Sequence, residues 1–200
     1  MKNDIIKQIT EAQNLMLNML TNELLISTLE SAAEACIKCL NQEGKIFLAG
    51  NGGSAADAQH IAGEFVSRFA FDRPGLPAIA LTTDTSILTA IGNDYGYAKI
   101  FSRQIQALGR KGDVFIGYST SGTSPNIINA FREAYAKGLI CIGFTGNRGG
   151  TLRTLCNYLI EVPSSDTPRI QEGHAVLGHI LCSLVESDIF KVSFQDLWRF

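Results

Sequence analysis

The chain has 200 residues, of which 46% are hydrophobic and 18% charged, and its formal net charge is −2. This composition is typical of a folded globular protein and excludes a disordered chain, and 200 residues are enough to bury a substantial core. The small negative charge also argues against a nucleic-acid-binding protein, which normally carries a basic surplus or a basic stripe.

The sequence shows no sign of a membrane or export segment. No apolar run approaches the roughly 18 residues that a membrane span needs. Charged and amide residues interrupt the N-terminal stretch MKNDIIKQITEAQNLML, which therefore lacks the core of a signal peptide. Five cysteines, an odd number, do not make a complete disulfide framework. We therefore expect a cytoplasmic protein whose partners include neither a membrane nor a nucleic acid.

The first 42 residues predict a helical extension. Apolar residues recur every three to four positions across residues 3–41, which predicts two helices with a break at Thr21-Asn22-Glu23. These helices would cover the sheet or pack against another copy of the chain, so we expect residues 1–42 to serve packing and oligomerisation. Cys36 and Cys39 lie in the second helix, where no second cysteine pair completes a metal site. We interpret them as buried core thiols rather than redox or metal-binding groups.

From residue 45 onward, short apolar runs alternate with helical patterns. This alternation predicts an α/β fold, a three-layer sandwich in which helices flank a five-stranded, mostly parallel sheet. We expect a single domain over residues 1–200, with ligands beyond the carboxyl ends of the strands. The predicted strands are 45–50, 76–81, 113–118, 139–144 and 158–162, and the predicted helices between and after them are 54–69, 84–92, 97–108, 124–137, 149–155 and 168–190.

The first predicted strand runs into a glycine-rich loop, Gly50-Asn51-Gly52-Gly53-Ser54. Glycines let a backbone turn sharply and approach a ligand closely. We expect Ser54 to cap the following helix, with Asp57 as the second member of a capping box, and the helix N-terminus to offer free N–H groups to an anion. A plain tight turn between strand and helix is the alternative interpretation.

The third predicted strand runs into a hydroxyl-rich loop, Ser119-Thr120-Ser121-Gly122-Thr123-Ser124-Pro125. Ser124 suits the N-cap of the next helix and Pro125 its first position. Hydroxyls, backbone N–H groups and a helix N-terminus together make a phosphate cradle that needs no lysine. A solvated serine and threonine loop without a ligand is the alternative.

Two of the three histidines have partners at helical spacing. His60 and Glu64 are four residues apart and share one helix face, which suits a divalent metal, an acid–base pair, or a plain surface ion pair. On the last helix, Gln171 and His179 are about 12 Å apart along an ideal axis. Spacing therefore favours Glu172, seven residues before His179, as readily as Gln171, unless Gln171 precedes the regular helix.

Four motifs carry a resemblance to a known family. GNGGSA and STSGTSPN resemble the ligand loops of the sugar isomerase (SIS) domain, whose members bind phosphosugars through the serine and threonine loop. AADAQHIAGEF and TPRIQEGHAVLGHIL resemble the paired signatures of the phosphoheptose isomerases within that family. The likeness extends over nearly the whole chain, including the two N-terminal helices and Gly92-Asn93-Asp94. Pro168 stands where some members have aspartate, and we assign it no role.

The resemblance implies a zinc enzyme with one ion per subunit. The ligands carried over to this sequence are His60, Glu64, Gln171 and His179. The family is homotetrameric with active sites between subunits, so the four ligands need not come from one chain. The implied reaction interconverts sedoheptulose 7-phosphate and D-glycero-D-manno-heptose 7-phosphate through an enediol. It is the first step of ADP- or GDP-heptose synthesis for surface glycans such as lipopolysaccharide core or capsule.

On this basis the catalytic and substrate-binding residues can be named. We predict Glu64 as the catalytic base, which also touches substrate, and His179 as its partner acid and base. Gly92–Gly96 predicts a turn between two helices, whose Asn93 and Asp94 could bond sugar hydroxyls, or else a plain helix stop. The expected phosphate ligands are Ser119, Thr120, Ser121 and Ser124, and the expected sugar-binding residues are Asn51, Gly52, Gly53, Ser54, Asn93, Asp94 and Gln171.

Two other functions compete with the isomerase. A noncatalytic SIS binding protein would act through a protein partner and would not need Glu64 or His179. A different SIS enzyme, such as a hexulose-phosphate isomerase or a phosphosugar hydrolase, generally lacks this set of four ligands. Asp57 either orients His60 or caps its helix, and His174 is expected in the core or an interface. Residues 190–200, with Trp198, resemble an apolar tail that seeks a partner surface.

Overall fold

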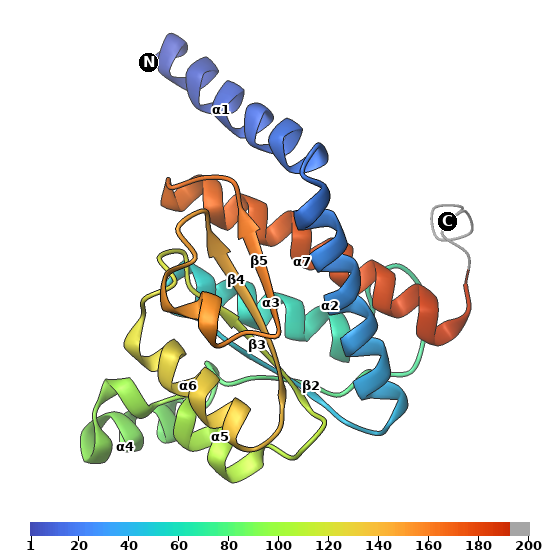
Figure 1. Ribbon diagram of the computed structural model, residues 1–200, viewed down its shortest axis with the longest axis vertical. Coiled ribbons are helices and arrows are strands. Elements are labelled where there is room, and N and C mark those ends of the chain that lie inside the picture. Colours follow the sequence, from blue (N-terminus) through green and yellow to red (C-terminus); the bar gives the residue numbers. More distant parts are fainter. Residues whose placement is uncertain (193–200) are drawn as a thin grey trace.

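The computed structural model describes residues 1–192, so most of the predicted apolar tail, including Trp198, lies outside the described residues. The elements follow the order expected of an α/β fold (Figure 1). The α-helices are α1 (Lys2–Leu20), α2 (Glu23–Asn41), α3 (Gly53–Val66), α4 (Thr85–Tyr95), α5 (Ser102–Leu108), α6 (Pro125–Ala136) and α7 (Thr167–Phe190). The strands are β1 (Ile46–Ala49), β2 (Ala78–Ala80), β3 (Val114–Tyr118), β4 (Ile140–Gly146) and β5 (Tyr158–Val162), and the 3-10 helices are η1 (Tyr97–Lys99) and η2 (Gly150–Thr154).

The five strands form one parallel sheet in the order β2-β1-β3-β4-β5. Phe47 of β1 pairs with Ile79 of β2 on one side and with Phe115 of β3 on the other. Because the strands are parallel, all their carboxyl ends lie at the same edge of the sheet. Since β1 and β3 are neighbours, the glycine loop and the hydroxyl loop lie side by side at that edge.

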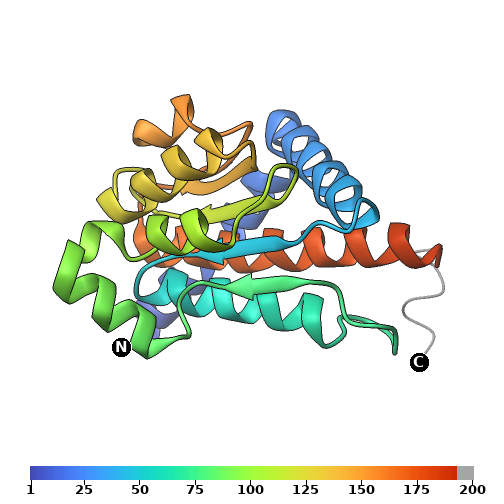
Figure 2. The same ribbon diagram turned by 90° about the horizontal axis from the view of Figure 1, so that it is seen from below.

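Successive side chains of each strand point to opposite faces of the sheet and so pack into two different hydrophobic clusters. Ile46 and Leu48 pack beneath α2, α3 and α7, whereas Phe47 packs with residues of α5 and α6 on the opposite face. The sheet is therefore the middle of three layers (Figures 1 and 2), which confirms the predicted sandwich. Gly117 of β3 lets Phe131 of α6 lie directly on the sheet, because a Cβ atom there would be 2.5 Å from the phenylalanine ring.

The predicted turn at Gly92–Gly96 is wrong except at its last residue. Residues 92–95 complete α4, and the helix ends at Gly96, whose φ of 83° favours glycine. A helix tolerates one internal glycine, so Gly92 does not stop it. The predicted helix 97–108 divides into η1 and α5, and the predicted helix 149–155 is the 3-10 turn η2.

The N-terminal helices bury very different amounts of surface. α2 packs on α7 and β5 and is capped by Asn22, whose Oδ1 accepts the N–H of Leu25 at 3.1 Å. By contrast α1 projects from the body of the molecule (Figure 1) and buries only Leu15 and Met19. An apolar cavity of about 640 Å³ lies where α1, α2 and α7 meet. Among the described residues, no helix has both the length and the apolarity needed to cross a bilayer.

The cysteines match the prediction of core thiols. Cys36 and Cys39 are buried and unbridged, as are Cys141 and Cys182, while Cys156 is half-buried and also free. Burial raises the pKa of the Cys39 thiol to about 11 and that of Cys36 higher still, so both are protonated at neutral pH. Thiols in this state are neither good nucleophiles nor ready metal ligands.

His174 is a core residue, one of the two places expected for it. Its ring is fully buried between Tyr118 and Phe144, with ring centroids 5.7 Å from each. No described residue makes a hydrogen bond to either ring nitrogen. Burial lowers the pKa of His174 from 6.5 to about 4, because the charged imidazolium would lose its hydration.

His174 should therefore make the protein sensitive to acid. Below pH 6.5 the unfolded chain takes up a proton at His174, and the folded chain does so only near pH 4. The contribution of neutral His174 to the free energy of unfolding is fully present above pH 6.5 and is lost as the pH falls toward 4. The loss is about 2.5 kcal/mol at pH 4.5. Urea unfolding of wild type and His174→Phe, from pH 7.5 to 4.5, measures this difference. Parallel pH profiles for the two proteins would contradict it.

Candidate functional site

The glycine loop turns sharply at Gly50 and Gly52. A Cβ atom on Gly50 would lie 2.2 Å from the carbonyl oxygen of Ser54, and Gly52 has φ 57° and ψ −122°, a conformation that only glycine adopts readily. α3 therefore begins at Gly53 with Gly52 at its N-cap. The predicted cap at Ser54 and its capping box with Asp57 are wrong, because Ser54 lies buried in the first helical turn.

This tight start also uses N–H groups that were expected to face an anion. The N–H of Ser54 donates to the Asn51 carbonyl and that of Ala55 to the Gly52 carbonyl, both at 3.0 Å. The N-terminus of α3 therefore offers fewer free donors than a simple helix start would.

The hydroxyl loop forms a compact cradle at the start of α6. Ser124 occupies the N-cap position and Pro125 the first helical position, as predicted. The Ser124 side chain makes no cap bond to the backbone; its Oγ lies 3.1 Å from the Oγ of Ser119, which closes the two ends of the loop. Ser121 is exposed, and its Oγ accepts hydrogen bonds from the N–H and hydroxyl of Thr123. Thr120 is half-buried, and its carbonyl accepts from the N–H of Gly146.

Four segments meet at this edge of the sheet. The side-chain amides of Asn51 and Asn126, the latter in the first turn of α6, exchange hydrogen bonds at 2.9 and 2.7 Å. The hydroxyl of Tyr97 donates to Asn51 Oδ1 at 3.1 Å. The side chain of Gln171, from the first turns of α7, lies so close to Gly53 that a Cβ atom there would be 2.5 Å from its Nε2. The glycine loop thus touches both α6 and α7.

Further along α3 and α7, the histidine and carboxylate groups converge. Nε2 of His60 lies 2.8 Å from Nε2 of His179 and 3.3 Å from Oε1 of Glu64. One candidate ligand atom from each of these three residues can be chosen so that all lie within 4.8 Å of one another. His60 is exposed while the other two are half-buried, so the cluster is open to a ligand. The contact joins two helices that the sequence separates by more than 100 residues.

The donor set fits a divalent cation such as zinc. Zinc binds imidazole nitrogen at about 2.0–2.1 Å, so tetrahedral ligand atoms are about 3.3 Å apart. The observed separations of 2.8 and 3.3 Å are close to this value, and two imidazoles with one carboxylate leave a fourth position for a further ligand. The predicted ligands His60, Glu64 and His179 are therefore brought together in one chain.

Gln171, the fourth predicted ligand, is not part of this cluster. α7 begins at Thr167, so Gln171 lies within the regular helix, and the alternative that it precedes the helix is wrong. It faces Gly53, about 12 Å along the axis from His179. Glu172, the residue that spacing favoured equally, is paired with Arg169. Neither side chain completes the three-residue cluster in this chain.

Asn93 and Asp94, the other predicted sugar ligands, lie apart from the loops. Both are exposed in the last turn of α4, where Asn93 Nδ2 donates to Asp94 Oδ1 at 2.9 Å. Tyr97, just beyond them, is the residue of this segment that reaches the glycine loop. Asp57 is half-buried, and burial raises the pKa of its carboxyl. With its predicted capping role excluded, an orienting role toward His60 stays a prediction.

Sequence reasoning missed an ion pair that holds the ends of α3 and α7 together. Nε of Arg73 lies 2.7 Å from Oε1 of Glu186, and both side chains are almost fully buried. The same guanidinium donates to the carbonyls of Glu64 and Phe65 at the end of α3. Glu186 accepts the backbone N–H groups of Phe69 and Ala70. Residues 113 positions apart give no periodic signal, which is why the sequence did not reveal this pair.

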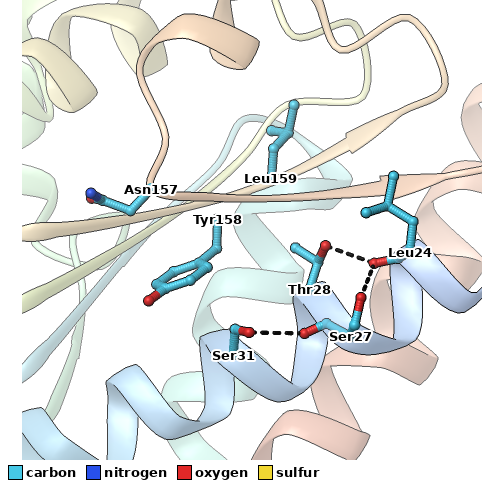
Figure 3. Close-up of a pocket in the computed structure, with 7 residues that line it drawn as sticks. All are labelled: Leu24, Ser27, Thr28, Ser31, Asn157, Tyr158 and Leu159. Carbon is cyan, nitrogen blue, oxygen red and sulfur yellow. Dashed lines mark hydrogen bonds between the residues drawn. The ribbon is translucent and has the colours of Figure 1, made fainter.

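A second hydroxyl-lined hollow, between α2 and β5, carries no comparable chemistry (Figure 3). It contains Ser27, Thr28 and Ser31, but each of these hydroxyls donates to a carbonyl of its own helix at 2.7–3.1 Å. Asn157 in the same hollow accepts the N–H of Cys141. Its polar groups therefore serve the fold, and none of the predicted site residues lies there.

Comparison with known proteins bears on the class of protein to which the chain belongs. The sequence model of the SIS domain matches residues 7–146. A phosphoheptose isomerase of Burkholderia pseudomallei is 73% identical over 93% of this chain and 94% of the relative, and that of Aneurinibacillus thermoaerophilus is 60% identical over 98% and 99%. The solved phosphoheptose isomerase of Neisseria gonorrhoeae is 42% identical, with a TM-score of 0.87 over 93% of this chain and 98% of the other.

The fold, with its glycine and hydroxyl loops, and the matching sequence model thus define a SIS-domain protein. Within that class, the chain belongs to the phosphoheptose isomerase family of sugar-phosphate isomerases. It is therefore an enzyme, and the predicted family is confirmed.

The buried Arg73–Glu186 pair should contribute far more to stability than a surface pair of the same length. Arg73→Met leaves a buried carboxylate without its cation, so we expect the free energy of unfolding to fall by about 3–5 kcal/mol. Arg153 and Glu161 form a matched control, also 2.7 Å apart but partly exposed, and Arg153→Met should cost less than about 1 kcal/mol. Chemical denaturation measures both. Equal losses would show that burial of the pair does not matter.

Proposed function

We propose that this enzyme interconverts sedoheptulose 7-phosphate and D-glycero-D-manno-heptose 7-phosphate. The observation that carries the proposal is the convergence of His60, Glu64 and His179 on one open site, on the helices that also border the two ligand loops. Membership of the phosphoheptose isomerase family supports the substrate class. A noncatalytic binding protein would have no use for a glutamate and a histidine held in this arrangement.

The hydroxyl loop is the proposed phosphate site. Ser119, Thr120, Ser121 and Ser124 surround the N-terminus of α6, a 12-residue helix whose positive end favours an anion. The mutual contact of Ser119 and Ser124 orients both hydroxyls before the ligand arrives. Asn51, Gly52, Gly53 and Ser54 of the adjacent loop, with Asn93, Asp94 and Gln171, are the proposed sugar-binding residues.

The proposed chemistry moves one proton between two carbons. Glu64 removes a proton from C1 of the ketose, the electron pair forms the C1–C2 double bond, and His179 donates a proton to the C2 carbonyl oxygen. The resulting enediol then loses its C1 hydroxyl proton to His179, and C2 takes the proton from Glu64. Atoms and electrons balance without any co-reactant.

Zinc is the proposed cofactor, one ion per subunit. His60, Glu64 and His179 would hold it with Gln171 as the fourth protein ligand, and a bound cation would polarise the carbonyl and hydroxyl oxygens. Within one chain Gln171 lies about 12 Å along α7 from His179, which supports a site completed by Gln171 of the partner subunit.

The proposed assembly is a homotetramer. Ile5, Ile6, Ile9, Leu17 and Leu20 are exposed apolar residues of α1, and burial against other copies would remove them from water. α4 likewise buries no residue within its own chain. We propose that residues 1–42 serve this assembly and that the whole chain forms one SIS domain.

We place the enzyme in the cytoplasm, at the first step of ADP- or GDP-heptose synthesis for surface glycans such as lipopolysaccharide core or capsule. Its five free thiols suit a reducing compartment. The product keeps the phosphate at C7 and has its anomeric carbon at C1, where the substrate has it at C2. A kinase or phosphatase acting at the ends of the sugar would therefore be expected next.

The isomerase reaction can be tested with purified protein and sedoheptulose 7-phosphate. We expect turnover that a chelator abolishes and zinc restores. Glu64→Gln and His179→Ala should each lower kcat at least about 100-fold, because each removes a group that moves a proton. Glu43→Gln, which alters an exposed glutamate of the turn after α2 and outside the segment proposed for assembly, is the control and should keep wild-type activity.

Two results would contradict the proposal. Folded, zinc-supplied wild type that binds the sugar phosphate without converting it would favour the binding-protein function. Turnover that survives complete metal removal would exclude the zinc site while leaving the isomerase reaction in place.

A further inference from the structure

The contact between the two ligand loops has a fixed hydrogen-bond direction. The N–H of Ile127 donates to Asn126 Oδ1 at 3.0 Å, so this atom must be the carbonyl oxygen of the amide. A flipped amide would set an NH2 group against an N–H. Asn126 Nδ2 must then donate to Asn51 Oδ1, and Asn51 Nδ2 to Asn126 Oδ1.

The side chain of Asn51 is left with one free hydrogen-bond donor. Its Oδ1 receives both Asn126 Nδ2 at 2.7 Å and the Tyr97 hydroxyl at 3.1 Å, which uses both lone pairs. One hydrogen of its Nδ2 is bound to Asn126. The second Nδ2 hydrogen is what remains for a ligand.

We infer that Asn126 is a positioning residue, which together with Tyr97 presents Asn51 to the substrate as a hydrogen-bond donor only. The inference rests on the proposed function, in which Asn51 binds the sugar. The matching group is an oxygen of the phosphosugar that accepts a hydrogen bond, such as a hydroxyl or carbonyl oxygen. Asn126 is 2% exposed, so it acts on the sugar through Asn51.

The surroundings of Asn51 agree with this role. Asn51 and Tyr97 line the same cavity, of about 140 Å³, beside the glycine loop. Thr82 lines it too, and its buried hydroxyl has no partner among the described residues, so the cavity offers a second polar group to a sugar.

The loop needs this external support because of its own sequence. Asn51 stands between Gly50 and Gly52, and glycines restrict the backbone least. Without Asn126 the Asn51 side chain would have to be ordered when the sugar binds, at a cost in free energy. Asn126 belongs to α6, whose N-terminus is the proposed phosphate site. The Asn51–Asn126 pair therefore also links the glycine loop to the hydroxyl loop.

A double-mutant cycle tests whether Asn126 acts through Asn51. The variants are Asn51→Ala, Asn126→Ala and the double variant, with kcat and KM measured on sedoheptulose 7-phosphate. We expect Asn126→Ala to lower kcat/KM about 10- to 100-fold, since small misplacements of a positioning group have effects of this size. In the Asn51→Ala background the same substitution should cause no further loss.

Two further measurements separate positioning from folding. The inhibition constant of inorganic phosphate should stay within about twofold of wild type in Asn126→Ala, because the hydroxyl loop does not depend on Asn51. Tyr97→Phe removes one donor from an exposed side chain and should fold normally. Its smaller loss in kcat/KM should also vanish in the Asn51→Ala background.

Asn129→Ala is the matched control. Asn129 lies on the same helix and donates to the Ala98 carbonyl at 3.0 Å, and not to Asn51. We expect this variant to keep wild-type kcat/KM. A loss equal to that of Asn126→Ala would show that any broken hydrogen bond of α6 has the same effect.

The outcomes are distinguishable. Losses that multiply in the double variant, or phosphate binding weakened as much as kcat/KM, would overturn the positioning role while leaving the isomerase proposal intact. Wild type that neither converts nor binds the phosphosugar would overturn the proposed function, and the inference about Asn126 with it.

Discussion

The packing of α3 against α7 determines where every candidate catalytic group lies. The two helices run in the same direction, since Gly53 meets Gln171 near their starts and His60 meets His179 further on. Gly178 permits the close approach, because a Cβ atom there would be 2.8 Å from Ile61. At the far end the buried Arg73–Glu186 pair ties the carbonyls of α3 to α7. Because α3 and α7 are held together at both ends, the side chains of His60, Glu64 and His179 stay close enough to share one metal ion.

The parallel sheet supplies the second constraint. It sets the glycine loop beside the hydroxyl loop, and the Asn51–Asn126 pair joins them. The glycine loop lies at the start of α3, whereas the histidine cluster lies further along α3 and α7. Gln171 lies with the glycine loop in its own chain rather than with His179.

The sequence predicted those features that depend on local pattern. Apolar periodicity placed all five strands and most helices, and His60 and Glu64 were found because helical spacing sets them on one face. Local pattern could not show which pairs meet across the fold. Arg73 and Glu186 are 113 residues apart and Asn51 and Asn126 are 75 apart, so their contacts exist only after folding. The predicted cap at Ser54 is wrong because two glycines let the helix begin two residues earlier, with Gly52 at the N-cap.

Anomalous diffraction at the zinc edge, on crystals grown with zinc and a phosphosugar, would show both proposed sites at once. We predict one zinc peak per subunit, within bonding distance of His60, Glu64 and His179, and the sugar phosphate in the Ser119–Ser124 loop. A zinc ion bound instead at Cys36 and Cys39, or a phosphate far from that loop, would contradict this prediction.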